Sequence, residues 1–314
     1  MATPSQAPSP EKQKLYEQIV DTLTAIFGLH AGYRPVHAKG LVCEGVFTAS
    51  PGAASLSRAP HLQGDPTRVL VRFSDFTGIP NIPDNDPNAN PRGLALKFQL
   101  ADGGETDILA HSINGFPVST AEGFLEFLQA LAASTPDSPH PTPIEKFVSS
   151  HRAAMSFVSP RPTPASFATE SFYAVNAVRF VNSQGDQRYG RYQIHPAAGE
   201  QHLTAEETAK MLPNFLFDEL EDRLVRDPFR LKLIAQIASE DDNVTDGSVT
   251  WPDEREQIEL GTIRVSKVLP DSAAAQQRLI FDPVRLVDGV ELSDDPLPAA
   301  RSAVYSISYA RRNS

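Results

Sequence analysis

The first apolar pattern along the chain has the period of an amphipathic helix. Its members are Leu15, Ile19, Leu23 and Ile26. Ser9 is a suitable N-cap, Pro10 suits the first helical turn, and Gly28 follows the last apolar position. The sequence therefore predicts a helix over residues 10–27, preceded by a disordered tail over residues 1–9.

Short apolar or alternating runs predict strands at several later places. These runs are residues 41–47, 69–73, 94–100, 172–182, 187–195 and 260–268. The runs over residues 172–182 and 187–195 flank a polar tetrapeptide that contains Gly185, and this arrangement is typical of a hairpin. Helical spacing returns over residues 121–132, 204–212, 215–224 and 227–238. The second of these helices opens on a capping box from Thr204 to Glu207.

Loops rich in proline and polar residues separate these elements. Residues 75–90 form one long loop, and residues 134–143 and 159–164 are the most linker-like segments. They divide a strand-rich front half from a more helical rear half. Because the intervening segments are short, we expect a single α+β domain over residues 10–314.

Composition narrows the class of protein. The 314 residues are 40% hydrophobic and 21% charged, which is typical of a globular chain. The net charge of −11 opposes binding to nucleic-acid phosphates, and no apolar run approaches the ~20 residues of a membrane helix. Cys43 is the single cysteine, which excludes an internal disulfide, a Cys-based zinc site and an iron–sulfur cluster. The N-terminus shows no secretory signal, so we expect a cytoplasmic protein without nucleic-acid or membrane partners.

The segment after Pro298 carries the most specific candidate chemistry. As a helix, it places four polar residues at i, i+4, i+7 and i+11 on one face, namely Arg301, Tyr305, Ser308 and Arg312. An arginine one turn before a tyrosine favours the phenolate, which is a protein ligand of haem iron. Arg312 is placed to pair with a carboxylate such as a haem propionate. The same spacing is also typical of a core tyrosine packed on an arginine, and spacing alone favours that interpretation.

Two strand ends in the front half carry a second candidate. His37 precedes the strand over residues 41–47, and Ser74 follows the strand over residues 69–73. If both side chains face one cavity, the Ser74 hydroxyl can orient one imidazole nitrogen. A lone histidine is more often a surface or core residue, so spacing alone leaves both interpretations open.

Five ordered segments resemble those of the haem catalase family. Residues 34–40, Arg-Pro-Val-His-Ala-Lys-Gly, are similar to the family's distal histidine motif, and residues 71–74, Val-Arg-Phe-Ser, to its distal serine strand. Residues 91–98 and 107–128 resemble the next two segments, and residues 280–291 lead without a gap into Arg301-x-x-x-Tyr305. The resemblance covers most of residues 34–312. It implies a catalase-like antiparallel β-barrel core with surrounding helices and a C-terminal helix that carries the proximal haem ligand.

The resemblance also implies a role for each candidate residue. His37 is the expected distal base, Ser74 the hydroxyl that fixes its tautomer, and Tyr305 the expected iron ligand. The residues expected to bind the cofactor are Arg34, Val36, Arg72, Phe124, Arg301, Ser308 and Arg312. His111 stands where large catalases have a distal asparagine, and we expect the loss of that asparagine to weaken peroxide dismutation. His111 is a candidate catalytic residue that either donates a hydrogen bond in place of the asparagine or points away.

The implied cofactor is haem b, and the implied substrates are hydrogen peroxide (H2O2) and small organic reductants. Because the chain is much shorter than a full catalase, it most resembles the compact catalase-related peroxidases, often called minicatalases. We expect a peroxidase that reduces hydrogen peroxide, and organic peroxides, through Compound I, with weak catalase activity. We expect a homo-oligomer, with a dimer favoured. The alternatives are an allene oxide synthase type of enzyme that acts on fatty-acid hydroperoxides, and a haem-binding protein without catalysis.

Overall fold

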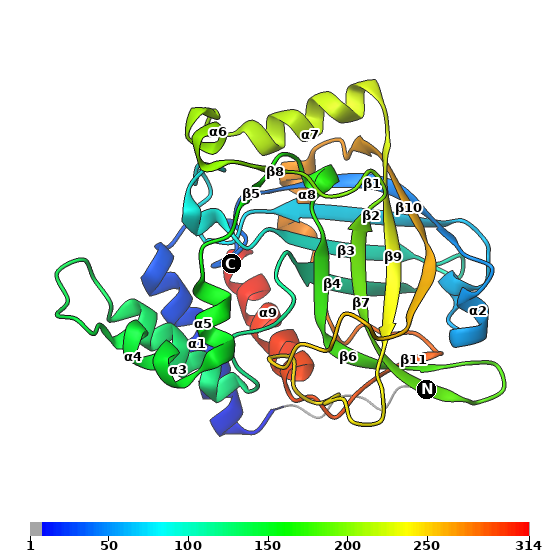
Figure 1. The fold of residues 1–314 in the computed structure, drawn as a ribbon, viewed down its shortest axis with the longest axis horizontal. Coiled ribbons are helices and arrows are strands. Elements are labelled where there is room, and N and C mark those ends of the chain that lie inside the picture. Colours follow the sequence, from blue (N-terminus) through cyan, green and yellow to red (C-terminus); the bar gives the residue numbers. More distant parts are fainter. Residues whose placement is uncertain (1–7, 314) are drawn as a thin grey trace.

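A closed antiparallel barrel is the central feature of the fold (Figure 1). The computed structural model describes residues 8–313. The strands are β1 (Gly40–Ala49), β2 (Thr67–Ser74), β3 (Gly93–Gln99), β4 (Glu105–His111), β5 (Thr163–Pro164), β6 (Phe172–Val181), β7 (Gln187–Pro196), β8 (His202–Leu203), β9 (Phe229–Ile237), β10 (Gln257–Val268) and β11 (Val290–Leu292). In the described part of the chain, eight strands pair in the order β6–β4–β3–β2–β1–β10–β9–β7, and β7 pairs back with β6 to close the ring. Strand β11 adds to β6, and β5 pairs separately with β8.

Helices surround the barrel unevenly. They are α1 (Pro10–Phe27), α2 (Ala53–Leu56), α3 (Ala121–Ala132), α4 (Pro143–Ser150), α5 (Arg152–Val158), α6 (Ala205–Lys210), α7 (Phe215–Arg226), α8 (Ser272–Arg278) and α9 (Leu297–Arg312). Figure 1 shows α9 between the barrel and a layer that contains α1 and α3, while α6 and α7 lie across the top of the barrel. The C-terminal helix is therefore enclosed by protein on two sides.

Apolar side chains that alternate along the strands fill the barrel. Val71 and Phe73 of β2 are fully buried in the main apolar cluster, as are Leu94 and Leu96 of β3. Leu220 of α7 joins the same cluster from outside the sheet. Each such side chain contributes ~1.5–3 kcal/mol through removal from water. The residues between them on β2 and β3 consequently point to the outer face of the barrel.

A second apolar cluster joins the helices that face the outside of the barrel. Ile19 and Leu23 of α1 pack with Leu125 and Leu128 of α3 and with Ala300 of α9. The period of the apolar residues in α1 directs one face of this helix toward the cluster. This packing fixes α9 at a set distance from the outer face of the barrel.

Most elements predicted from the sequence are confirmed. The helices expected over residues 10–27 and 121–132 coincide with α1 and α3, and all six expected strands are present. The capping box between Thr204 and Glu207 opens α6. Of the tail expected over residues 1–9, residues 1–7 lie outside the described residues, and Ser9 caps α1 by accepting from the Lys12 amide.

The helix predicted over residues 227–238 is wrong, because this segment forms β9. Its buried residues Leu231, Leu233 and Ala235 alternate with the less buried Arg230, Lys232 and Ile234. Leu231, Ile234 and Ala235 also fit the i, i+3, i+4 spacing of a helix, but the apolar residues at every second position from 229 to 237 fit the period of a strand, which pairs with β10 and β7. Since β6, β7, β9 and β10 all belong to the ring, the expectation of a rear half more helical than the front is also wrong.

Buried charges hold the long loop over residues 75–90. Arg92 forms an ion pair with Asp75, and Lys39 forms one with Asp84. The side chains of Asp75, Asp84 and Arg92 have no exposed surface. Burial raises the pKa of the Asp75 carboxyl, and the nearby Arg92 opposes this rise. Because a buried charge without its partner is costly, these pairs fix the loop beside β2.

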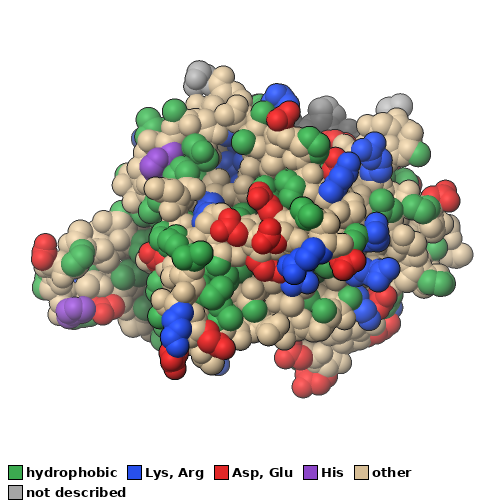
Figure 2. Space-filling view, turned by 90° about the horizontal axis from the view of Figure 1, so that it is seen from above, with side chains coloured by type: hydrophobic (Ala, Val, Ile, Leu, Met, Phe, Trp, Pro, Cys, Tyr) green, Lys and Arg blue, Asp and Glu red, His purple; other side chains and the backbone are tan. Residues whose placement is uncertain are grey.

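The surface shows charges of both signs. On the face seen in Figure 2, which lies over α6 and α7, Lys and Arg side chains are interspersed with Asp and Glu. On this face of the described residues they form no continuous basic surface. No helix within residues 8–313 has the length and apolar character needed to span a bilayer.

His61 gives the fold a testable dependence on pH. Its ring is 2% exposed and packs against Phe98, at 4.8 Å between centroids, and its Nδ1 has no hydrogen-bond partner among the described residues. Burial lowers the pKa of His61 to about 4. As the pH falls below about 6.5, the unfolded chain therefore takes up a proton that the folded chain resists, and stability is lost.

The substitution His61→Phe removes this proton uptake. Between pH 7 and pH 5 the variant is expected to lose about 2 kcal/mol less unfolding free energy than the wild type. Urea unfolding at the two pH values measures the difference. His151→Phe, at an exposed position where the ring stacks on Phe147, is the matched control and should follow the wild type. Equal losses in His61→Phe and wild type would contradict the prediction.

Candidate active site

A large cavity lies between the outer face of β2, β3 and β4 and the helices α1, α3 and α9. It contains about 1400 Å³ of empty space, part of it open to solvent. Its walls are mostly apolar. All the site residues predicted from the sequence line it: Arg34, Val36, His37, Arg72, Ser74, His111, Phe124, Arg301, Tyr305, Ser308 and Arg312.

Strand register brings the distal residues together. Ser74 of β2 pairs with Gly93 of β3, and Gly93 pairs with His111 of β4, so the three positions form a row across the sheet. A Cβ atom at Gly93 would lie 2.5 Å from Ser74 Oγ and 2.7 Å from His37 Nδ1. The imidazole of His37 therefore occupies space that any larger residue at position 93 would fill. The sequence motif contains Gly93, but its steric role needed the register.

His37 has a strained backbone and a fixed tautomer. Its φ of +56° is uncommon for a residue with a side chain. Two hydrogen bonds hold this conformation, one from the His37 amide to the Phe76 carbonyl at 2.7 Å and one from Arg72 Nη2 to the His37 carbonyl at 2.8 Å. Nδ1 lies 2.9 Å from the Asp75 carbonyl and 3.1 Å from Ser74 Oγ. Because a carbonyl oxygen can only accept, Nδ1 carries the proton and Nε2 is left with its lone pair.

The resemblance implied that Ser74 alone fixes this tautomer. The geometry adds the peptide carbonyl of Asp75, which no side-chain pattern in the sequence reveals. Burial, assisted by Arg72, lowers the pKa of His37 to about 3. His37 is therefore neutral at any pH well above 3, and its Nε2 is unprotonated and able to accept a proton.

His111 has the opposite tautomer. Its Nδ1 accepts from the Ile113 amide at 3.3 Å, so the proton is on Nε2. Among the residues that the structure describes, Nε2 has no hydrogen-bond partner. Burial, followed by the charge of Arg301, lowers the pKa of His111 to about 3. The Phe157 ring meets the His111 ring edge to face at 5.9 Å between centroids.

Three arginines at one side of the cavity bond only to neutral groups. Arg34 donates to the Leu279 carbonyl at 2.8 Å, and Arg312 donates to the same carbonyl at 2.6 Å. Arg72 donates to Gln276 Oε1 at 2.9 Å and to the His37 carbonyl. No carboxylate within residues 8–313 forms an ion pair with any of the three.

Burying these three arginines close together is electrostatically unfavourable. Burial lowers the pKa of Arg72 to about 9, and Arg312 adds to the effect. Burial, then the charges of Arg72 and Arg312, also lowers the pKa of Arg34. Buried cations of like sign are stable only when an anion compensates them. The cluster therefore fits a ligand that carries carboxylates.

On α9, a chain of hydrogen bonds reaches Tyr305. Arg301 Nε donates to the Tyr305 hydroxyl at 3.1 Å, and Arg301 Nη1 donates to Asn176 Oδ1 at 2.6 Å. Asn176 Nδ2 donates to Asp295 Oδ2 at 2.8 Å, and Asp295 Oδ1 accepts from the Leu297 amide at 2.8 Å. The carboxylate at the start of α9 thus orients Asn176, and Asn176 orients the guanidinium toward the phenol.

Sequence reasoning missed Asn176 and Asp295. Asn176 lies in a strand of a hairpin, where nothing in the pattern distinguishes it. Asp295 did leave a signal, because an aspartate just before Pro296 and an apolar run is typical of a helix start.

The cavity fits the haem that the resemblance implies. Apolar walls suit the porphyrin ring, three uncompensated arginines suit its propionates, and a phenol next to a guanidinium suits its iron. The two cavity histidines add one nitrogen acceptor and one N–H donor. Each of these features is a property of this chain's own side chains.

Comparisons with known proteins agree with this geometry. The family model described as catalase matches residues 19–314. The chain is 34% identical over 300 residues to a catalase-related peroxidase of Mycolicibacterium paratuberculosis (strain ATCC BAA-968 / K-10), covering 94% of each chain. It is 31% identical over 300 residues to a catalase-related peroxidase of Synechococcus elongatus (strain ATCC 33912 / PCC 7942 / FACHB-805), covering 94% of this chain and 88% of the relative.

Solved catalases share the fold. A fungal catalase superposes with a TM-score of 0.79 at 24% identity, over 90% of this chain and 60% of its own length. Catalase A from Saccharomyces cerevisiae gives a TM-score of 0.79 at 22% identity, over 90% of this chain and 62% of its own length. The chain therefore spans about 60% of the length of these two enzymes. With a family model matched along nearly its whole length, the chain belongs to the catalase family.

Proposed function

We propose that this chain is a haem-dependent peroxidase that reduces hydrogen peroxide with electrons from small organic donors. The observation that carries the proposal is a single cavity with a basic, neutral imidazole nitrogen on His37 and a phenol bound to a guanidinium at Tyr305. Family membership implies haem, and we propose haem b. Relatives named catalase-related peroxidase favour this function over the fatty-acid hydroperoxide alternative.

Tyr305 is the proposed iron ligand. Donation from Arg301 Nε at 3.1 Å stabilises negative charge on the phenol oxygen, which is the form that binds iron. Asn176 and Asp295 act indirectly, because they fix the direction of the guanidinium. Bound haem supplies the redox chemistry, while the protein determines its orientation and its electrostatic surroundings.

The other cavity residues hold the cofactor in place. Arg34, Arg72 and Arg312 are proposed to bind the propionates, which would compensate their buried charge. Val36 and Phe124 provide apolar contact to the ring, and Ser308 contributes a buried hydroxyl from α9.

His37 is the proposed acid–base group. Its Nε2 would accept a proton from one oxygen of hydrogen peroxide and return it to the other oxygen, which would leave as water when the O–O bond breaks. The two electrons for this cleavage would come from the haem, and organic donors would return them with two protons, so that the first oxygen also ends as water. The Asp75 carbonyl and Ser74 Oγ keep Nδ1 protonated throughout this transfer. Because its pKa is near 3, His37 begins each cycle in the neutral form that the first step needs.

His111 is proposed to donate a hydrogen bond in the same space. Its Nε2–H has no partner among the described residues, so a peroxide oxygen or a donor hydroxyl is free to accept from it. An asparagine offers both a donor and an acceptor, whereas this tautomer of His111 offers only a donor. We therefore propose that His111 favours oxidation of organic donors over dismutation of peroxide.

The domain organisation, the oligomeric state and the location of the protein are further parts of the proposal. We propose one domain over residues 10–314, a homodimer and a cytoplasmic location. The single cysteine, Cys43, is buried and free, which suits a reducing compartment. Light scattering of the purified holoprotein tests the dimer.

Substitution of Tyr305 tests the iron ligand. Tyr305→Phe removes the phenol oxygen but retains the ring, so the variant is expected to purify with less than a tenth of the wild-type haem. Absorbance in the Soret region measures haem content per chain. Tyr309→Phe, one turn along α9 and outside the cavity lining, is the matched control and should retain full haem. An unchanged haem spectrum in Tyr305→Phe would refute the assignment.

Substitution of His37 tests the acid–base group. His37→Asn is chosen because asparagine tolerates the positive φ at this position. The variant should keep haem, but its second-order reaction with hydrogen peroxide should slow by ~10²–10⁴-fold. Stopped-flow absorbance measures this rate.

The same measurement tests the pKa of His37. Loss of the basic form as the pH falls requires protonation near pH 3, so the wild-type rate should stay constant between pH 7 and pH 5. A tenfold decline through pH 6.5 would show that His37 titrates as an exposed histidine and would contradict the geometry.

Substitution of His111 tests its effect on the balance of activities. His111→Asn restores a side chain that both donates and accepts, so the ratio of dismutation to peroxidation should rise severalfold. Oxygen evolution and phenol oxidation, measured on one preparation with matched haem content, give the ratio. An unchanged ratio would show that His111 does not select between the two reactions.

A further inference from the structure

The segment over residues 279–285, here called the Leu279 strap, connects α8 to the loop before β11 and touches the cavity. Its first carbonyl, at Leu279, accepts hydrogen bonds from both Arg34 and Arg312, at 2.8 Å and 2.6 Å. Ile280 and Phe281 of the strap line the cavity. A single peptide oxygen therefore fixes the relative position of Arg34 and Arg312.

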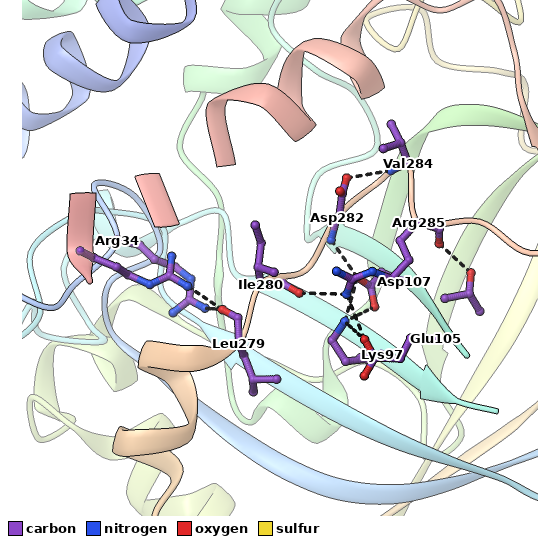
Figure 3. A network of polar contacts seen from close by, with 11 residues as sticks. Arg34, Lys97, Glu105, Asp107, Leu279, Ile280, Asp282, Val284 and Arg285 are labelled. Atoms are coloured by element: carbon purple, nitrogen blue, oxygen red, sulfur yellow. Dashed lines mark hydrogen bonds and ion pairs between the residues drawn. The ribbon is translucent and has the colours of Figure 1, made fainter. Parts of the chain in front are cut away.

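A cluster of four charged side chains lies behind the strap (Figure 3). Lys97 Nζ lies 2.8 Å from Asp107 Oδ1 and 3.1 Å from Glu105 Oε2. Arg285 Nη1 lies 3.1 Å from Asp107 Oδ2 and 3.2 Å from Glu105 Oε2. Lys97 and Asp107 are 2% and 3% exposed, so the centre of the cluster is inside the protein. Lys97 and Arg285 thus share the same two carboxylates.

This cluster fixes the strap through several bonds. The Asp282 amide donates to Asp107 Oδ2 at 2.8 Å, and Arg285 Nη1 donates to the Ile280 carbonyl at 3.3 Å. The Arg285 carbonyl accepts from the Asp107 amide and from Thr106 Oγ1. The close-up in Figure 3 shows the strap between this cluster and Arg34. The position of the Leu279 carbonyl therefore depends on β3 and β4 through the charged cluster.

A contribution to folding stability does not by itself explain why four charged side chains lie behind the strap. Removing charges from water costs several kcal/mol per ion, and apolar residues of similar volume often stabilise a fold equally well. What a buried charge network adds is a unique geometry, because its hydrogen bonds are directional and any displacement leaves a charge unpaired. The strap is a segment where geometry matters, because its carbonyl orients guanidinium groups toward the cavity.

We propose that Lys97, Glu105, Asp107 and Arg285 form a positioning cluster for carboxylate recognition in the cavity. The cluster holds the Leu279 carbonyl, and that carbonyl orders Arg34 and Arg312 so that their remaining N–H groups meet the two haem propionates. Arginines that are already ordered lose less side-chain entropy on binding. This inference rests on the proposed function, since it takes haem as the carboxylate-bearing ligand.

The experiment compares apoprotein affinity for haem and for haem dimethyl ester, in which both propionates are uncharged. Titrations followed in the Soret region give the two dissociation constants. The wild type should prefer haem by about 10- to 100-fold, the range expected for charge-assisted hydrogen bonds. Arg285→Gln breaks the cluster at a partly exposed residue and should weaken haem binding about tenfold while leaving ester binding unchanged.

Two controls separate positioning from general destabilisation. Arg188→Gln removes an arginine that pairs with Glu256 on the surface, and it should bind both ligands as the wild type does. Arg312→Gln should reduce the preference for haem directly. In the double variant with Arg285→Gln, the change in haem-binding free energy should be smaller than the sum of the changes in the two single variants. If Arg285→Gln does not fold, Glu105→Gln disrupts the same cluster from its most exposed member.

The outcomes are distinguishable. If Arg285→Gln weakens haem and ester binding equally, or changes neither, the cluster does not position the arginines and the inference is wrong. If the wild-type apoprotein binds haem and ester with equal affinity, the arginines do not bind the propionates, and this part of the proposed function is overturned. If Arg285→Gln loses affinity for haem but not for the ester, the result supports both the positioning cluster and propionate binding by the arginines.

Discussion

The close contact between His37 and Gly93 is the constraint on which the cavity depends. Gly93 stands between Ser74 and His111 in the row set by the barrel register, and only hydrogen at this position leaves space for an imidazole. The same register brings Arg72 onto the outer face two residues before Ser74. A one-residue slip of β2 against β3 would turn both side chains into the barrel. The barrel therefore acts as the template on which the distal side of the site is assembled.

Two groups of buried charged side chains lie near the barrel. They differ in whether a side chain of opposite charge is paired with them. Lys97 and Arg285 share two carboxylates, and Arg92 is paired with Asp75, so the charges in these groups are paired within the protein. Within residues 8–313, Arg34, Arg72 and Arg312 have only carbonyl and amide hydrogen-bond acceptors and no carboxylate partner. The contrast within one protein indicates where an external anion belongs. Charges that stabilise a loop or strap are paired internally, whereas those that face the cavity are left for a ligand.

The sequence predicts those parts of the site whose residues lie on one element. The stripe of Arg301 and Tyr305 follows from helical period alone, and α9 confirms it. Contacts between distant segments were not predictable in this way. Asn176 touches Arg301 across 125 positions in sequence, and the Asp75 bond to His37 uses a peptide carbonyl that every residue possesses.

The error at β9 has a different origin. Leu231, Ile234 and Ala235 fit helical spacing, but apolar residues at every second position from 229 to 237 fit the period of a strand, so the correct period is present in the sequence itself. Local pattern thus carries the type of each element, while the neighbours of a strand and its hydrogen-bond partners depend on tertiary context. The resemblance to catalases succeeded where local pattern could not, because ordered motifs carry information about segments that meet only in the folded chain.

The two cavity histidines are complementary. Burial lowers the pKa of both to about 3, so both are neutral at ordinary pH, yet their backbone partners impose opposite tautomers. A carbonyl acceptor at Nδ1 leaves His37 with a bare Nε2, and an amide donor at Nδ1 leaves His111 with a protonated Nε2. Hydrogen peroxide has both a proton to give and lone pairs to accept with. A cavity that offers one acceptor and one donor, each without a hydrogen-bond partner among the described residues on its ligand side, therefore matches both the proton and the lone pairs of this small substrate.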